Sequence, residues 1–258
     1  MATRVFALGN SHLTCMEQAY ASYGPPSDVP FDFLNLNFHK EGLSAIHEKK
    51  LGLSDYVVQY WSALRPHNAD EETLFVSQLG GNEHNVLGLI EHPRSFDFIL
   101  PDNPDLPPIA GAEIVPYDYV RQTLRRRVWG SVFHIGKIIQ KTGKTVVHLP
   151  PPPPIGDGAF VAKHLDKYFL NKADCTKVAA SLLRWKLWML QTDLARELCQ
   201  ELGAIFWASP KSRMDSQGFL LPKYFSNDAT HGNLEFGQSQ NEAIASALHS
   251  GSFQEEGK

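Results

Sequence analysis

Val5-Phe6-Ala7-Leu8-Gly9-Asn10-Ser11-His12 is a short apolar run that ends in a polar turn. The apolar residues predict a buried strand over 5–8, which Gly9 and Asn10 terminate. The residues from Ser11 to Tyr23 predict a helix, because Gly24-Pro25-Pro26 follows and breaks it. A hydroxyl at such a strand-to-helix junction is exposed at the carboxyl edge of its sheet, which makes Ser11 a candidate for chemistry.

Strand-like and helix-like patterns alternate along the rest of the chain. Further strands are expected over 31–37, 74–79, 145–149 and 204–208, and further helices over 117–142, 176–202 and 233–249. Short apolar strands separated by helices are typical of an α/β protein whose parallel sheet is covered on both faces. Functional residues of such sheets gather in the loops beyond the carboxyl ends of the strands.

The composition is that of an ordinary soluble globular protein. The 258 residues are 43% hydrophobic and 20% charged, with a net charge of −4, so no strong attraction to nucleic acid or to an anionic membrane is expected. We see no apolar stretch long enough to span a bilayer. Cys15, Cys175 and Cys199 lack metal-type spacing, so we expect reduced thiols and a cytoplasmic protein.

We expect a single domain over 1–258, in which 91–116 is an extended, proline-rich surface loop and 250–258 is a polar tail. The run Pro150–Pro154 directly follows a predicted strand and is interpreted as a stiff polyproline turn, with a partner-docking site as the alternative. The motif Gly80-Gly81-Asn82 lacks the lysine and the spacing of a phosphate-binding loop.

Four side chains in three distant motifs are candidates for a catalytic site. Ser11 offers a nucleophile, and Asn82, after two glycines, offers an amide donor for an oxyanion. Asp228 and His231 are three apart, a spacing that places a carboxylate and a base on the same side of a helical turn. Each motif has an ordinary alternative, since Ser11 and Asn82 are common helix caps and an Asp-x-x-His pair is often a solvated turn.

Three blocks of sequence together resemble the SGNH (GDSL-type) hydrolase family. They are Leu8-Gly9-Asn10-Ser11, Leu79-Gly80-Gly81-Asn82 and Asp228-Ala229-Thr230-His231-Gly232-Asn233, which are similar to the first, third and fifth blocks of that family in order and spacing. The first block departs from the family pattern, because Asn10 stands where members usually carry Asp. The second block supplies a glycine amide, and Gly42 is the glycine that follows the second predicted strand at a sensible distance.

The resemblance implies a flavodoxin-like three-layer α/β/α sandwich around a parallel five-stranded sheet. It also implies that Ser11 attacks an acyl carbonyl, that His231 takes its proton and that Asp228 holds the imidazolium. The backbone amides of Ser11 and Gly42 and the side chain of Asn82 then form the oxyanion hole. His12 and His84 flank the site motifs and are candidates for contact with the substrate, although the favoured interpretation is that they are polar neighbours without a chemical role.

The implied activity is hydrolysis of short-chain acyl or O-acetyl esters, on a small-molecule or carbohydrate substrate, through an acyl-enzyme and without a cofactor or a metal. Two alternatives stay open at this point. One is an O-acyltransferase on the same scaffold, acting on a sugar or another hydroxyl, and the other is a non-catalytic binding protein. The sequence leaves the oligomeric state open.

Overall fold

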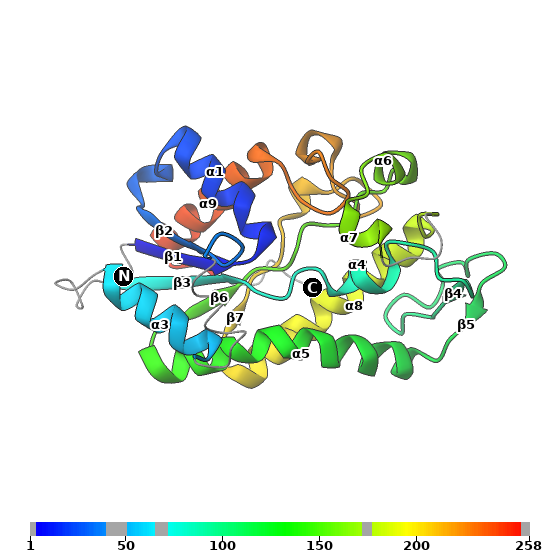
Figure 1. Ribbon diagram of the computed structural model, residues 1–258, viewed down its shortest axis with the longest axis horizontal. Helices are drawn as coiled ribbons and strands as arrows, with labels where there is room; N and C mark the ends of the chain where they lie inside the picture. Colours follow the sequence, from blue (N-terminus) through cyan, green and yellow to red (C-terminus); the bar gives the residue numbers. More distant parts are fainter. Residues whose placement is uncertain (1–3, 40–50, 65–71, 172–176, 254–258) are drawn as a thin grey trace.

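The centre of the molecule is a parallel sheet of five strands (Figure 1). The computed structural model describes residues 4–39, 51–64, 72–171 and 177–253. The strands lie in the order β2-β1-β3-β6-β7, and their bounds are β1 Arg4–Gly9, β2 Phe31–Asn35, β3 Thr73–Gln78, β6 Val146–His148 and β7 Ile205–Phe206. Gly9 pairs with Asn35 on one side and with Gln78 on the other, so these three strands end at the same edge.

Alternate residues of β1 enter two separate apolar cores. Phe6 and Leu8 pack with α3 (Leu53–Leu64), α5 (Tyr117–Thr142) and α8 (Ser181–Leu202). Val5 and Ala7 pack with α1 (Thr14–Tyr23) and α9 (Leu234–Ser250). Figure 1 shows the same two groups of helices on opposite sides of the sheet. The two-residue period of a strand therefore produces three layers, and the predicted flavodoxin-like α/β/α sandwich is confirmed.

Shorter elements occupy the connections. The helices are α4 (Glu83–Gly88), α6 (Gly158–Lys163) and α7 (Lys167–Leu170), and the 3-10 turns are η1 (Ser11–Leu13), η2 (Pro26–Asp28), η3 (Lys211–Arg213) and η4 (Pro222–Tyr224). Strands β4 (Phe96–Asp97) and β5 (Glu113–Ile114) form a small second sheet. No helix in the described part of the chain combines the length and the hydropathy needed to cross a membrane.

The predicted elements agree with the structure best where glycine ends a helix. The helix over 117–142 is confirmed with both bounds, and Gly143 ends it with a φ of 64°. The helix expected over 176–202 begins later, at Ser181. The reason is that Ala179 donates its amide to the Leu89 carbonyl at 3.0 Å, and Val178 bridges to Ile90, so this segment is extended. The sequence interpretation omitted α3 and α4.

The proline run Pro150–Pro154 is buried. The Trp188 indole donates to the Pro151 carbonyl at 3.2 Å, and the Leu220 amide donates to the Pro154 carbonyl at 3.0 Å. The alternative interpretation of this run, a partner-docking site, is therefore wrong, because these residues are buried in the interior.

The segment 91–116 is mostly irregular but is not confined to the surface. Phe98 and Asp97 are fully buried. The Lys186 ammonium of α8 donates to the two Asp97 carboxylate oxygens at 2.9 and 3.0 Å and to the Phe98 carbonyl at 3.1 Å. A buried ion pair and an aromatic side chain thus fix this segment to the α8 layer.

Candidate active site

Ser11, Asp228 and His231 line one cavity at the carboxyl edge of the sheet, with a volume of about 520 Å³. Ser11 follows β1 directly, in η1. Asp228 and His231 lie in the loop between η4 and α9. A bridge between Phe225 and Gly232 closes this loop at its base. Residues more than two hundred positions apart therefore share one concave surface, as the sequence motifs predict.

The Asp228 carboxylate holds the His231 imidazole through a single oxygen. His231 Nδ1 lies 2.9 Å from Asp228 Oδ1. The same oxygen accepts from the backbone amides of Thr230 at 2.9 Å and of His231 at 2.8 Å. Residues 227–230 form bends rather than a helix. The expectation that a helical turn brings Asp228 and His231 together is therefore wrong. The pair is formed by a turn in which the aspartate accepts from its own downstream backbone.

The charge state of Asp228 follows from these bonds. Burial on its own raises the pKa of this carboxyl, but the hydrogen bonds from the His231 ring and from the Thr230 and His231 amides outweigh it and hold the pKa well below its usual range. Asp228 therefore stays ionised and accepts the Nδ1 proton, which leaves His231 Nε2 as the nitrogen available for proton transfer.

Ser11 does not use its side chain to cap a helix. The capping positions of η1 and α1 are Asn10 and Leu13, and neither cap involves a side-chain hydrogen bond. No hydrogen bond joins Ser11 Oγ to His231 Nε2, both of which belong to described residues, and His231 Nε2 is buried without a partner. Hydrogen bonds between a nucleophile and its base are often long in the absence of substrate and shorten on binding.

Asn82 starts α4 without capping it through its side chain. Its Oδ1 instead accepts from Asn85 Nδ2 at 2.8 Å, so the Asn82 Nδ2 group is left to donate elsewhere. Asn82 follows a tight turn in which Gly80 has a φ of 76°, a conformation that favours glycine. Neither Asn82 nor His12 is among the residues that line the 520 Å³ cavity.

His12 packs against the His231 ring. The two imidazole rings are 4.6 Å apart between centroids. A methyl group at Gly81 would collide with His12 Cδ2, so a side chain at this position would force the buried His12 ring to move. Burial, followed by His231 and His84, keeps the pKa of His12 well below its usual range, and the nearby Asn82 side chain offsets this only in part, although neither ring nitrogen makes a hydrogen bond of normal geometry.

His84 is buried away from the cavity and contacts Gln191 of α8. His84 Nδ1 and the His84 backbone amide lie 2.9 and 2.7 Å from Gln191 Oε1. Burial lowers the pKa of His84 to about 4. These contacts give His84 a place in the support of the turn rather than on the cavity wall. Sequence reasoning missed Gln191, because nothing in the pattern of a mostly buried helix identifies one polar residue as a contact of a turn 110 positions away.

Two remaining features are Gly42 and the metal-ligating residue types. Gly42 lies outside the described residues, so the second oxyanion amide is left as a sequence-based expectation. Within the described ranges, no group of three or more His, Cys, Asp or Glu side chains is arranged to hold a metal ion.

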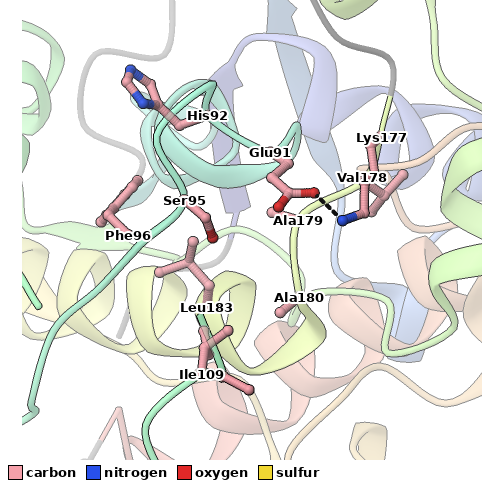
Figure 2. A pocket seen from close by; sticks show the side chains of 11 residues that line it. Glu91, His92, Ser95, Phe96, Ile109, Lys177, Val178, Ala179, Ala180 and Leu183 are labelled. Carbon is pink, nitrogen blue, oxygen red and sulfur yellow. Dashed lines mark ion pairs between the residues drawn. The ribbon is translucent and has the colours of Figure 1, made fainter. Parts of the chain in front are cut away.

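A second cavity, of about 230 Å³, lies beyond the end of α4 (Figure 2). The Glu91 carboxylate and the Lys177 ammonium form an ion pair at 2.7 Å on its wall. It shares no lining residue with the cavity of Ser11 and His231. None of the candidate catalytic or oxyanion residues that the structure describes lines this second cavity.

Comparison with known proteins supports the fold. No family model and no curated protein matches this chain. Among solved structures, a candidate platelet activating factor from Streptococcus pneumonia is 9% identical, with a TM-score of 0.50, over 96% of this chain and 85% of that one. A carbohydrate acetylesterase from Sinorhizobium meliloti is 12% identical, with a TM-score of 0.46, over 96% of this chain and 99% of that one.

A GDSL-like lipase from Bacteroides thetaiotaomicron is 10% identical, with a TM-score of 0.45, over 97% of this chain and 89% of that one. Of these three structures, the one from Streptococcus pneumonia reaches a TM-score of 0.50 and agrees with the fold expected from the sequence motifs. At 9% identity, that similarity speaks for the fold alone.

Proposed function

We propose that this chain is a serine esterase that hydrolyses short-chain carboxylic esters through an acyl-enzyme. The observation that carries the proposal is the Asp228–His231 pair, hydrogen bonded at 2.9 Å, on the wall of a cavity that Ser11 also lines. A hydroxyl, an imidazole and a carboxylate that meet at one cavity are the parts of a serine triad, which is defined by geometry and not by chain order.

In the proposed reaction, Ser11 Oγ attacks the acyl carbon while its proton passes to His231 Nε2. Asp228 accepts the Nδ1 proton in a hydrogen bond and stabilises the imidazolium. The Asn82 Nδ2 group and the Ser11 amide donate to the oxyanion of the tetrahedral intermediate. Collapse of this intermediate breaks the bond to the alcohol, which leaves with the proton from His231. Water then attacks the acyl-enzyme by the same route and releases the acid.

The cavity wall favours a small acyl group. The polar residues that line the cavity with Ser11 include Thr14, Gln18, Asn227 and Asn233. The largest apolar residues of the cavity wall are Phe225 and Leu234. A long acyl chain gains about 0.8 kcal/mol for each buried methylene, but only where an apolar channel receives it. We therefore expect kcat/KM to change little, or to fall, as the acyl chain is lengthened from acetate to octanoate.

A labelling experiment tests the proposal directly. A fluorophosphonate probe should label the wild-type protein and should not label Ser11→Ala. Ser226 lines the same cavity, so Ser226→Ala is the matched control and should keep the label. Turnover of p-nitrophenyl acetate should be lost in Ser11→Ala and in His231→Ala. Wild-type turnover in both of those variants would refute the assignment.

A further inference from the structure

We infer that Gln191 is a positioning residue that acts through the turn carrying Asn82, the oxyanion donor of the proposed reaction. The inference rests on the proposed function. Gln191 lies on α8, and 2% of its surface is exposed. Leu187, Leu190 and Leu194 on the same helix are fully or almost fully buried. An amide in such surroundings is costly unless its hydrogen bonds are made.

The Gln191 amide satisfies its hydrogen bonds on a single turn. Its Nε2 donates to the Gly80 carbonyl at 3.1 Å and to the Gly81 carbonyl at 3.2 Å. Its Oε1 accepts from the His84 backbone amide at 2.7 Å and lies 2.9 Å from His84 Nδ1. A side-chain amide has two donor hydrogens and two lone pairs on its oxygen. Gln191 therefore directs its full hydrogen-bonding capacity to residues 80–84.

These four contacts flank Asn82 on both sides in the sequence. The Gly80 and Gly81 carbonyls precede it, and the His84 amide, one of the donors that a helix leaves unpaired at its start, follows it. The backbone that carries Asn82 is therefore attached to α8 instead of being held by the turn alone. The Asn85 side chain then fixes the Asn82 amide itself by donating to its Oδ1 at 2.8 Å.

The contacts of Gln191 affect catalysis through the position of the Asn82 side chain. A donor stabilises an oxyanion only if it is held in position before the charge develops, and a displacement of about 1 Å can cost on the order of 100-fold in rate. Gln191→Met keeps the size of the side chain and removes all four contacts. We expect kcat to fall roughly 10- to 100-fold with little change in KM.

Thr192 supplies the matched control, because it is the next residue on α8, is also buried, and has a hydroxyl without a partner. Thr192→Val should therefore keep the kcat of the wild type. A lower melting temperature in Gln191→Met alone would not distinguish positioning from structure, so kcat is measured well below that temperature. Asn85→Ala is a second, milder variant that acts on Asn82 by one bond, and it should also lower kcat.

A double-mutant cycle identifies the route. If Gln191 acts through Asn82, then Gln191→Met should have almost no further effect on kcat in an Asn82→Ala background. Independent losses that multiply in the double variant would overturn the inference, as would a wild-type kcat in both Gln191→Met and Asn85→Ala.

Hydrogen exchange separates this inference from the proposed function. The His84 amide should be protected in the wild type and should exchange faster in Gln191→Met, while amides in α9 keep their rates. Unchanged protection of His84 would overturn the positioning role whatever the activity. If the His84 amide exchanges faster in Gln191→Met but the protein shows no Ser11-dependent labelling, the contacts between Gln191 and residues 80–84 are supported and the esterase assignment is refuted.

Discussion

Replacing Asp228 by asparagine separates two roles of this carboxylate, namely its charge and its control of the His231 tautomer. In serine triads this substitution usually costs about 10⁴-fold in kcat, because the new amide donates to the imidazole and stabilises the wrong tautomer. Here one oxygen, Oδ1, receives the His231 ring and also the backbone amides of Thr230 and His231. An asparagine oxygen should be held in that same position by the two backbone donors. We therefore expect Asp228→Asn to keep the correct tautomer and to lose only the charge.

The charge loss sets the magnitude. Two unit charges about 4 Å apart interact by about 4 kcal/mol in surroundings of intermediate polarity. The side chains of Asp228 and His231 are 32% and 20% exposed, so solvent reduces this to roughly 2–4 kcal/mol. Because each 1.36 kcal/mol is tenfold in rate, kcat for Asp228→Asn should fall roughly 30- to 1,000-fold. Asp228→Ala loses the tautomer as well and should fall by about 10⁴-fold.

The assay compares kcat for p-nitrophenyl acetate in the wild type, Asp228→Asn and Asp228→Ala, together with the thermal midpoint of each. Asn should keep the midpoint, whereas Ala should lower it, since two backbone amides lose their acceptor. Equal rate losses in the two variants would show that the backbone amides do not hold the oxygen. A wild-type rate in Asp228→Asn would show that the carboxylate does not stabilise the imidazolium.

Two further predictions concern stability. Burial lowers the pKa of His84 and of His148 to about 4. Between about pH 6.5 and pH 4 the unfolded state therefore binds more protons than the folded state. The free energy of unfolding should fall as the pH drops through this range. At pH 5 the loss should be about 2 kcal/mol for each histidine, and equal urea unfolding curves at pH 7.5 and pH 5 would contradict it. Lys186→Met leaves the Asp97 carboxylate buried without its cation and should cost about 3–5 kcal/mol. Asp97 also accepts from the Phe98 and Ile109 amides, so adding Asp97→Asn to Lys186→Met should restore part of the lost stability. A Lys186→Met variant as stable as the wild type would argue against a stabilising Lys186–Asp97 ion pair.

The three-layer architecture was predictable because it depends on local periodicity. The apolar run over 5–8 alternates between two cores, and Gly143 and Gly203 end α5 and α8 in the left-handed conformation that glycine favours. The start of α8 was predicted too early, because its upstream residues make a bridge with Ile90. Such a pairing joins segments almost ninety residues apart, and no local propensity reports it.

The candidate site was predictable as a set of residues but not as a geometry. Strand ends in a parallel sheet share one edge, so Ser11 was expected near the loop that precedes α9. The Asp228–His231 contact was expected for a different reason, since a bend and two backbone amides form it rather than a helical turn. His12 was expected as a neighbour of the substrate, but it lies beside the His231 ring with its charge suppressed by burial.

Sequence reasoning could not identify contacts to the site that come from residues of the covering helices. Gln191 belongs to α8 and binds the turn after β3, although 110 residues separate it from Gly81. A glutamine in a mostly buried helix has many possible partners, and only the packing of α8 against α4 selects this turn. Chemistry at the edge of a parallel sheet needs donors that are fixed before the reaction begins. The covering helices therefore do more than bury apolar surface, because a buried polar residue such as Gln191 fixes a turn at that edge from behind.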